Sequence, residues 1–400
     1  MPWKEKTVEE NREEFVKRSL AKEKSKSALC REYGISRPTG DKWIKRYLRG
    51  EILTDKSRAP FKHPHKTPNE TEAKILGLRR KHPAIGAVKL RKMLERKGEK
   101  GLPCTSTVNA ILKRNGCITA EASAAATPHK RFEKELPNEM WQTDFKGDFL
   151  LGDGQRCFPL CVLDDCTRFN LCIDAKESQR REPVMASFER LFHDYGLPNI
   201  LLCDNGNPWG TAQTTGITLF EIWLMNLGVL TIHARARHPQ TQGKEERFNG
   251  SLTRELLQHE KLKNMVDAQS KFDNYRQFYN NERPHHALNL DVPAQRYKKS
   301  NHKIPSKITE WKYDAGYEVR TIKKTGFLTY QGQGYFLSES LGGLEIGIKE
   351  SSVPGVLNLY YRNFRIAQLK PKERAVVSRR VYLAEGDPRP QRVSEKTPGL

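Results

Sequence analysis

The sequence lacks any apolar run of about 18 residues, the length at which a membrane-spanning helix is expected. The N-terminus, MPWKEKTVEENREEF, has no apolar stretch of the kind that secretory signals carry. No helix combines a basic face with exposed Trp or Phe, as membrane-surface helices do. We therefore expect an intracellular protein with no membrane partner.

Cysteine motifs and coiled-coil repeats are also absent. The chain has eight cysteines, and no two of them have the C-x-x-C spacing of zinc knuckles or thioredoxin-like sites. Four lie in apolar, strand-like runs, where cysteine acts as a small hydrophobic residue. No sustained heptads predict a coiled coil.

Positive charge, in contrast, is abundant and unevenly placed. The net charge is +22, and residues 1–135 hold 33 Lys and Arg against 17 Asp and Glu. A basic excess concentrated in one third of a chain favours a polyanionic partner. We expect that partner to be double-stranded DNA.

Residues 26–48 predict the first DNA-binding unit, because two short amphipathic helices are joined by a turn at Gly34. Ser36 can cap the second helix, whose inward face holds Trp43. The residues of this second helix that could contact DNA are Arg37, Thr39, Lys42, Lys45 and Arg46. The alternative is an ordinary helical hairpin with charged outer faces.

Composition and pattern divide the chain into seven segments. They are a helix-turn-helix domain (1–53), a basic linker (54–68), a second helix-turn-helix domain (69–116), a connector (117–137), an α/β core (138–298), a small β-barrel (313–370) and a basic tail (371–400). In the core, three strands precede a helix-strand-helix-strand-helix series, which predicts a mixed five-stranded sheet flanked by helices.

Three acids fall at comparable places in this predicted core. Asp144 lies in the first strand, Asp204 ends the fourth, and Glu246 begins the helix after the fifth. If the fourth strand pairs beside the first, the two aspartates become neighbours, and the helix can bring Glu246 to them. Clustered carboxylates need a compensating cation. Two hard ions such as Mg²⁺ or Mn²⁺ could activate an attacking oxygen and stabilise a leaving oxygen of a phosphodiester.

Each acid has a rival interpretation. Asp148 shares a strand face with Asp144, and Asp164-Asp165 forms another acidic pair. Asp204-Asn205-Gly206 alone is typical of a turn. Glu245 is adjacent to Glu246 but about 100° away around the helix. We prefer Glu246, because Phe248, Leu252 and Leu256 should form the buried stripe and leave it on a polar face.

The motifs WQTDFKG, VLDDCTRF, DNGNPWG, HPQTQGKEERFN and YNNERPHHALNLDVPAQRY resemble the catalytic region of bacterial insertion-sequence transposases with a retroviral-integrase-like core. The similarity is greatest to insertion sequence family four-eighty-one. It implies an RNase H-like core and a DDE triad of Asp144, Asp204 and Glu246, which would bind two Mg²⁺ or Mn²⁺ ions. It also implies a bacterial cytoplasmic, nucleoid-associated location.

The resemblance further implies a reaction and its partners. The helical units would bind the terminal inverted repeats of a mobile element, and the core would cleave the element ends and join the 3′-hydroxyls to target DNA. Two ends must be held together, so we expect a homo-oligomer. Gln242, Lys244 and Arg247 could contact DNA phosphates; alternatively, Lys244 and Arg247 pair with Glu245 at the surface. The rival functions are a nuclease that only cuts and a sequence-specific regulator with an inactive core.

Overall fold

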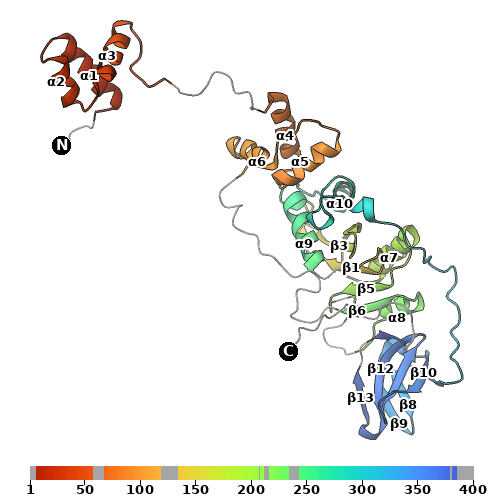
Figure 1. The fold of residues 1–400 in the computed structure, drawn as a ribbon. Coiled ribbons are helices and arrows are strands. Elements are labelled where there is room, and N and C mark those ends of the chain that lie inside the picture. The colour runs from red at the N-terminus through yellow and green to blue at the C-terminus, as the bar shows by residue number, and fades with distance from the viewer. Residues whose placement is uncertain are drawn as a thin grey trace. The chain divides into compact units, whose positions relative to one another are not determined.

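The computed structural model describes residues 6–56, 67–118, 134–206, 208–210, 216–233, 243–378 and 381–384. It divides the chain into two compact units, Met1–Lys66 and Thr67–Leu400, here called unit 1 and unit 2 (Figure 1). Gln242 and most of the predicted linker, connector and tail lie outside the described residues.

Unit 1 contains three helices, α1 (Val8–Leu20), α2 (Lys26–Glu32) and α3 (Arg37–Leu48). Thr7 and Glu10 form a capping box for α1, and Ser36 caps α3 by accepting a hydrogen bond from the Thr39 N–H. Gly34 allows the sharp α2–α3 turn because its φ is +63°. The predicted helix-turn-helix pair is therefore present, packed on α1.

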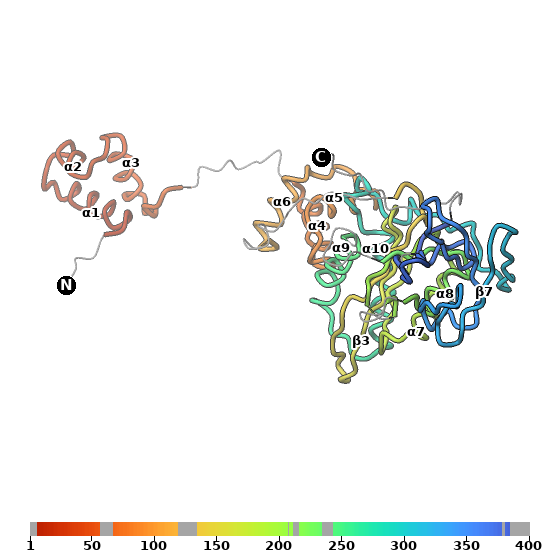
Figure 2. The backbone as a smooth tube through the Cα atoms, turned by 90° about the horizontal axis from the view of Figure 1, so that it is seen from below, coloured from red at the N-terminus to blue at the C-terminus, as the bar shows by residue number. Residues whose placement is uncertain are grey.

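Unit 2 begins with a second three-helix group, α4 (Asn69–Lys81), α5 (Ala87–Arg96) and α6 (Thr105–Arg114). Buried Ile75, Leu90 and Ile111 contribute to its own apolar core. The group also touches the rest of unit 2, since His82 stacks on Phe278 with 4.2 Å between ring centroids. Figures 1 and 2 both place α4–α6 beside α9 and α10.

The sheet at the centre of unit 2 is mixed. Its principal strands are β1 (Met140–Phe145), β3 (Arg156–Asp164), β4 (Asn170–Lys176), β5 (Ile200–Cys203) and β6 (Leu230–His233), in the order β4-β3-β1-β5-β6. β1, β5 and β6 run parallel, whereas β3 and β4 pair antiparallel. The five predicted strands are thus present. A short sixth strand, β2 (Phe149–Leu150), pairs antiparallel with the first two residues of β3.

Helices cover both faces of this sheet (Figure 1). α7 (Arg181–Tyr195) and α8 (Leu219–Asn226) bury Phe188 and Phe220 in an apolar cluster with Trp141. The other face carries α9 (Gly243–Leu252), the π-helix η3 (Thr253–Leu257) and α10 (Met265–Asn281). Short helices follow at His286–Leu288, Pro293–Arg296, Glu339–Leu341 and Pro371–Glu373.

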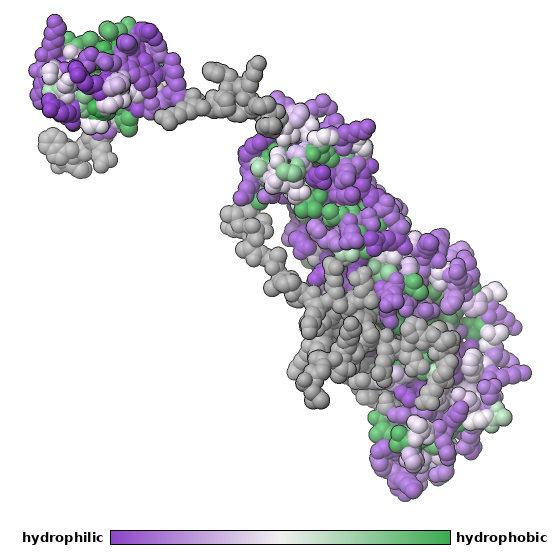
Figure 3. All heavy atoms as spheres, in the orientation of Figure 1, coloured by the Kyte–Doolittle hydropathy of each residue, from purple (hydrophilic) through white to green (hydrophobic). Residues whose placement is uncertain are grey.

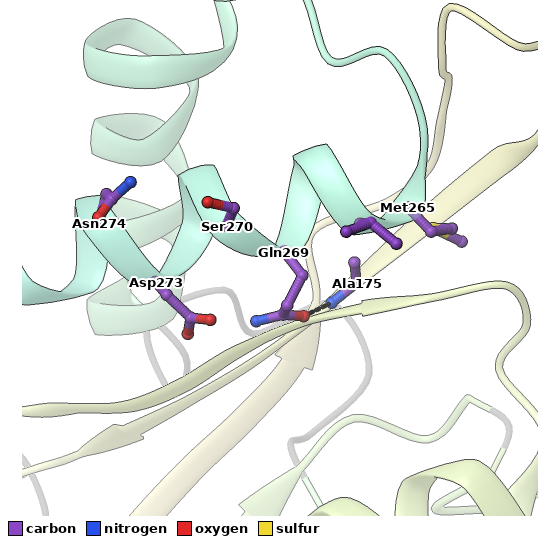
Figure 4. A pocket seen from close by; sticks show the side chains of 7 residues that line it. Ala175, Met265, Gln269, Ser270, Asp273 and Asn274 are labelled. Atoms are coloured by element: carbon purple, nitrogen blue, oxygen red, sulfur yellow. Dashed lines mark hydrogen bonds between the residues drawn. The ribbon is translucent and has the colours of Figure 1, made fainter.

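Side chains of α10 bond to the outer edge of β4, where a further strand would otherwise pair. Gln269 accepts a hydrogen bond from the Ala175 N–H at 2.8 Å and donates to the Ile173 carbonyl at 3.1 Å (Figure 4). Asn280 accepts from the Asn170 N–H and donates to its carbonyl. A pocket lined by Ala175, Met265, Val266, Gln269, Ser270, Asp273 and Asn274 lies along this junction. The edge is thereby protected from pairing with another chain.

The C-terminal strands are β7 (Glu318–Thr321), β8 (Phe327–Tyr330), β9 (Gln333–Phe336), β10 (Glu345–Glu350), β11 (Leu357–Tyr361), β12 (Phe364–Lys370), β13 (Ala375–Ser378) and β14 (Tyr382–Leu383). They form one sheet, β13-β12-β11-β10-β7 with β14 on β12, and a separate β8–β9 hairpin. A closed barrel is not confirmed within the described residues, because the hairpin does not bridge the outer strands β7 and β13 through ladder hydrogen bonds.

The C-terminal sheet packs on the β5–β6 side of the central sheet. Ile200, Leu230 and Leu359 belong to one apolar cluster that joins the two sheets. Ser338 Oγ also donates to the Ile217 carbonyl at 2.7 Å.

Hydrophilic residues cover much of the face seen in Figure 3. None of the described helices is long and apolar enough to cross a membrane.

Candidate active site and nucleic-acid interface

Asp144 and Asp204 lie at the carboxyl ends of two neighbouring parallel strands. β1 pairs with β5 in a register that aligns Gln142 with Leu202, so the two aspartates occupy the next equivalent positions. The Gly206 N–H donates to Asp204 Oδ1 at 2.9 Å, which closes the Asp-Asn-Gly turn. The turn and the acidic site are therefore compatible, although they were rival interpretations of the sequence.

The Asp144 carboxylate has a perturbed environment. Its pKa is raised to about 6, mainly by burial and then by the negative charges of Asp204 and Glu246, while hydrogen bonds from the Phe145 backbone and Asn249 act in the opposite direction. Asn249 Nδ2 donates to Asp144 Oδ2 at 3.2 Å. A carboxylate destabilised by other acids is suited to accept a cation.

Helix α9 carries Glu246 in its first turn, where the side chain is exposed. The predicted apolar stripe is confirmed, because Phe248, Leu252 and Leu256 are buried against the sheet and α10. Asn249 lies one turn after Glu246 and reaches Asp144. Asn249 thereby connects α9 to the carboxyl end of β1.

Glu245 is a buried acid that sequence reasoning misplaced. Its side chain is fully buried, and neither carboxylate oxygen has a hydrogen-bond partner among the described residues. Burial raises its pKa well above the usual range, and the nearby Asp144 charge adds to this. The alternative interpretation, in which Lys244 and Arg247 pair with Glu245 at the surface, is therefore wrong.

Lys244 pairs instead with Asp165, the second acid of the VLDDCTRF motif. Its Nζ lies 2.5 Å from Asp165 Oδ1, and the two side chains are 11% and 0% exposed. Asp164, also buried, accepts from the Thr167 hydroxyl and N–H and from the Asn138 N–H. This acidic pair is committed to internal contacts. Asp148, the other rival, pairs with Arg156.

A second internal contact supports the Asp204 loop. His233 Nδ1 donates to the Asp204 carbonyl at 2.8 Å, and its Nε2 lies 3.0 Å from Glu221 Oε1. Burial alone would lower the pKa of His233, but Cys203 and the Glu221 carboxylate reverse this and raise it. The sequence offered no signal for this contact, because Glu221 lies on an apolar helix and His233 ends a strand.

The donor set suits a hard divalent ion, since carboxylate oxygens are the ligands that Mg²⁺ and Mn²⁺ prefer. In the described part of the chain, however, no three His, Cys, Asp or Glu side chains are grouped closely enough to hold one ion as they stand. Asp144 and Asp204 are placed by strands, whereas Glu246 is exposed on the first turn of a helix.

Helix α3 presents only part of its predicted DNA-contacting set. Arg37, Lys42 and Lys45 are exposed, and Thr39 is half-buried with its hydroxyl bonded to Ser36. Arg46 is buried, donates to the Thr54 carbonyl and packs over Trp43. The prediction that Arg46 is available to DNA is therefore corrected: it holds the end of α3. Arg247 is exposed on α9.

Models of known protein families match four stretches of the chain. A helix-turn-helix domain matches residues 11–61, and a homeodomain-like domain matches residues 39–112. Two models, each described as an integrase core domain, match residues 134–239 and 227–293. The integrase matches include Asp144, Asp204 and Glu246.

Two of the curated relatives come from insertion elements, and a third comes from a virus. An uncharacterized 31.7 kDa protein of insertion element IS407 from Burkholderia multivorans is 27% identical over 257 residues, covering 61% of this chain and 87% of the relative. An uncharacterized 39.2 kDa protein of insertion element IS476 from Xanthomonas euvesicatoria is 26% identical over 181 residues, covering 44% and 50%. A putative integrase of Spiroplasma virus SpV1-C74 is 38% identical over 76 residues, covering 19% and 21%.

One similar solved structure is the HTLV-2 integrase catalytic core domain in complex with magnesium, at 16% identity and a TM-score of 0.32, covering 41% of this chain and 98% of that one. The chain therefore combines helix-turn-helix matches with integrase core matches in one polypeptide, and it is similar to proteins of insertion elements.

Proposed function

We propose that the chain is a divalent-metal-dependent DDE transposase whose catalytic triad is Asp144, Asp204 and Glu246. The observation that carries the proposal is the register of β1 and β5, which places Asp144 and Asp204 at equivalent positions, and both other acids help to raise the pKa of Asp144. Asp144 and Asp204 are neighbours because β1 and β5 pair in parallel. Their rivals Asp148 and Asp165 are already paired with cations.

The triad would hold Mg²⁺ or Mn²⁺, two ions per site. When bound, the ions would supply Lewis-acid stabilisation of the attacking and leaving oxygens. Asn249 would keep one Asp144 oxygen oriented. Glu246 would complete the site by a change of side-chain rotamer, which its exposed position permits.

The DNA chemistry would take place in two steps, hydrolysis and then strand transfer. In the first, a water oxygen bonds to phosphorus at the element end while the bond to the 3′ oxygen breaks, leaving a 3′-hydroxyl and a 5′-phosphate. In the second, the oxygen of that 3′-hydroxyl bonds to a phosphorus of target DNA while the bond from this phosphorus to the target's own 3′ oxygen breaks, which leaves a 3′-hydroxyl on the target. The second step needs no covalent protein–DNA intermediate.

The terminal inverted repeats would be bound by the two helical groups, α1–α3 and α4–α6. In the first of them, Arg37, Lys42 and Lys45 would contact the DNA. A homo-oligomer would hold two element ends together.

The decisive variant is Asp144→Asn, which keeps the shape of the side chain but removes its charge. We expect it to bind a duplex ending in the terminal repeat that flanks the gene with wild-type affinity. It should lose Mg²⁺-dependent cleavage of that duplex by 100-fold or more, on the order expected when a charge-stabilising group is lost. Asp148→Asn is the matched control and should cleave normally. Equal cleavage by Asp144→Asn and the wild type would refute the triad.

Two rival functions are separated by the products. A transposase joins a pre-cleaved repeat end to a supercoiled plasmid, whereas a nuclease only shortens the repeat end. A sequence-specific regulator with an inactive core would bind the repeat and give neither product. Joining that requires Asp144, Asp204 and Glu246 would exclude both rivals.

A further inference from the structure

The ion pair between Lys244 and Asp165 joins the start of α9 to the turn after β3. Lys244 is the second residue of α9, and its Nζ contacts both Asp165 Oδ1 at 2.5 Å and the Asp165 carbonyl at 3.1 Å. One ammonium group therefore bridges the side chain and backbone of a single turn residue. Both side chains are shielded from water.

Asp165 is in turn fixed to the strand that carries Asp144. Gln142 Nε2 donates to Asp165 Oδ1 at 2.5 Å, and the Asp165 N–H donates to the Met140 carbonyl at 3.0 Å. Asp165 Oδ2 accepts from the Lys134 N–H at 2.7 Å. Gln142 and Asp144 are two residues apart on β1 and so share one face of the sheet. A continuous set of contacts thus runs from Lys244 to the strand of Asp144.

The helical phase makes this contact relevant to Glu246. Residues two apart on an α-helix point about 200° from each other. Lys244 and Glu246 therefore lie on opposite sides of the buried face formed by Glu245 and Phe248, and Glu246 is exposed. Glu245, one position away, is directed into the core beside Asp144. The ion pair consequently fixes the rotation of the first turn of α9.

We propose that Lys244 and Asp165 are positioning residues of the active site: their buried ion pair sets the place and rotation of Glu246 relative to Asp144. This inference rests on the proposed function of the triad. It also gives Lys244 an internal task in place of the phosphate contact that the sequence suggested. Removing one partner leaves the other charge buried and uncompensated, so the first turn should shift or open.

Lys244→Met tests the proposal, because methionine keeps much of the apolar stem and removes the charge. With the repeat-ended duplex as substrate, we expect kcat for cleavage to fall by about 100-fold, the scale of a small misplacement of a catalytic group. KM and Kd for the duplex should stay within about twofold, because no phosphate contact is lost. Amide hydrogen exchange in the first turn of α9 should quicken. Lys244→Arg should recover most of the activity.

Matched variants separate the possible failures. Lys271→Met is the control variant: Lys271 lies on α10 and forms ion pairs with Glu260, which precedes α10, and with Asp267. This variant should behave as wild type. Asp165→Asn should lower kcat. The double variant Lys244→Met/Asp165→Asn should lose little more activity than either single variant, because both substitutions remove the same ion pair. A weaker Kd with a reduced salt dependence in Lys244→Met would overturn the inference in favour of a phosphate contact.

An unchanged kcat in Lys244→Met would also overturn the inference that the Lys244–Asp165 ion pair positions Glu246, provided that Glu246→Gln is inactive. A fully active Glu246→Gln would instead defeat the proposed triad itself. A loss of kcat in Lys244→Met that matches the unfolded fraction at the assay temperature would reduce the pair to a stabilising contact. Melting curves measured beside the assay decide that point.

Discussion

Arg283 and Glu255 form a two-pronged ion pair inside unit 2. Arg283 Nε lies 2.7 Å from Glu255 Oε2, its Nη2 lies 2.7 Å from Oε1, and the side chains are 7% and 8% exposed. Glu255 belongs to the π-helix that extends α9, and Arg283 follows α10. The pair therefore ties the helix of Glu246 to the helix that bonds to the edge of β4.

Arg283→Met should be strongly destabilising. Within the described part of the chain, the buried Glu255 carboxylate then keeps one hydrogen-bond donor, the Tyr275 hydroxyl at 3.2 Å. Removing one partner of a buried pair costs about 3–5 kcal/mol. Denaturant unfolding should show this loss. Arg296→Met, at an exposed pair with Asp291, should cost at most about 1 kcal/mol, and equal losses in the two variants would contradict the argument.

Asn280→Ala should expose the edge of β4. The Asn280 amide bonds to both backbone groups of Asn170, and its loss leaves that N–H and carbonyl without their partner. We expect a loss of about 2 kcal/mol or more, since each unsatisfied buried group costs about 1–3 kcal/mol, together with faster aggregation on heating. Light scattering and denaturant unfolding measure the two effects. Asn281→Ala, at the exposed neighbour, should change neither; an equal effect there would reject the edge-protection argument.

Local patterns predicted much of the fold and the site. Caps such as Thr7 and Ser36, the glycine turn at Gly34 and the apolar stripe of Phe248 and Leu252 act over one or two helical turns, so the sequence displays them directly. The approach of Asp204 to Asp144 was predicted on the condition that the fourth strand pairs beside the first, and β5 does pair in parallel with β1.

Contacts between distant segments could not be predicted in the same way. Lys244 and Asp165 are 79 residues apart, and the choice between a phosphate contact and an internal ion pair depends on which way the first turn of α9 rotates. Glu245 was missed because a charged residue is rarely buried without a partner. The barrel expectation went beyond the pattern, because strand count does not determine whether β8 and β9 bridge the outer strands.

Lys45 and Arg46 are adjacent in α3 but should respond differently to substitution by alanine. Lys45 is exposed, so Lys45→Ala should keep the wild-type melting temperature and weaken binding to the repeat duplex. The slope of log affinity against log salt should fall by about one, as for one lost phosphate contact. Arg46→Ala should lower the melting temperature of unit 1, because Arg46 donates to the Thr54 carbonyl and packs on Trp43. Fluorescence anisotropy over a salt series and thermal melts distinguish the two; a reversed pattern would exchange their roles.

His285 should make the protein less stable in weak acid. Burial lowers its pKa to about 2, and the charges of Arg283, Lys89 and Arg168 act in the same direction, while a bond to the Tyr279 backbone opposes them. The folded state therefore keeps the ring neutral, whereas the unfolded chain binds a proton below the ordinary value of 6.5. The contribution of this group to the free energy of unfolding is therefore fully present above pH 6.5 and is lost as the pH falls toward 2. The loss between pH 7.5 and 5 should be about 2 kcal/mol.

His285→Gln removes this titration, so its free energy of unfolding should depend less steeply on pH over that interval, whatever its stability at pH 7.5. Arg283 Nη1 lies 3.4 Å from His285 Nε2, so the glutamine amide oxygen can take the place of the ring nitrogen as acceptor. His302→Gln, at an exposed side chain, should keep the wild-type slope. Parallel pH curves for wild type and His285→Gln would mean that the ring is protonated in the folded protein, and the assignment of a neutral, buried histidine would then fail.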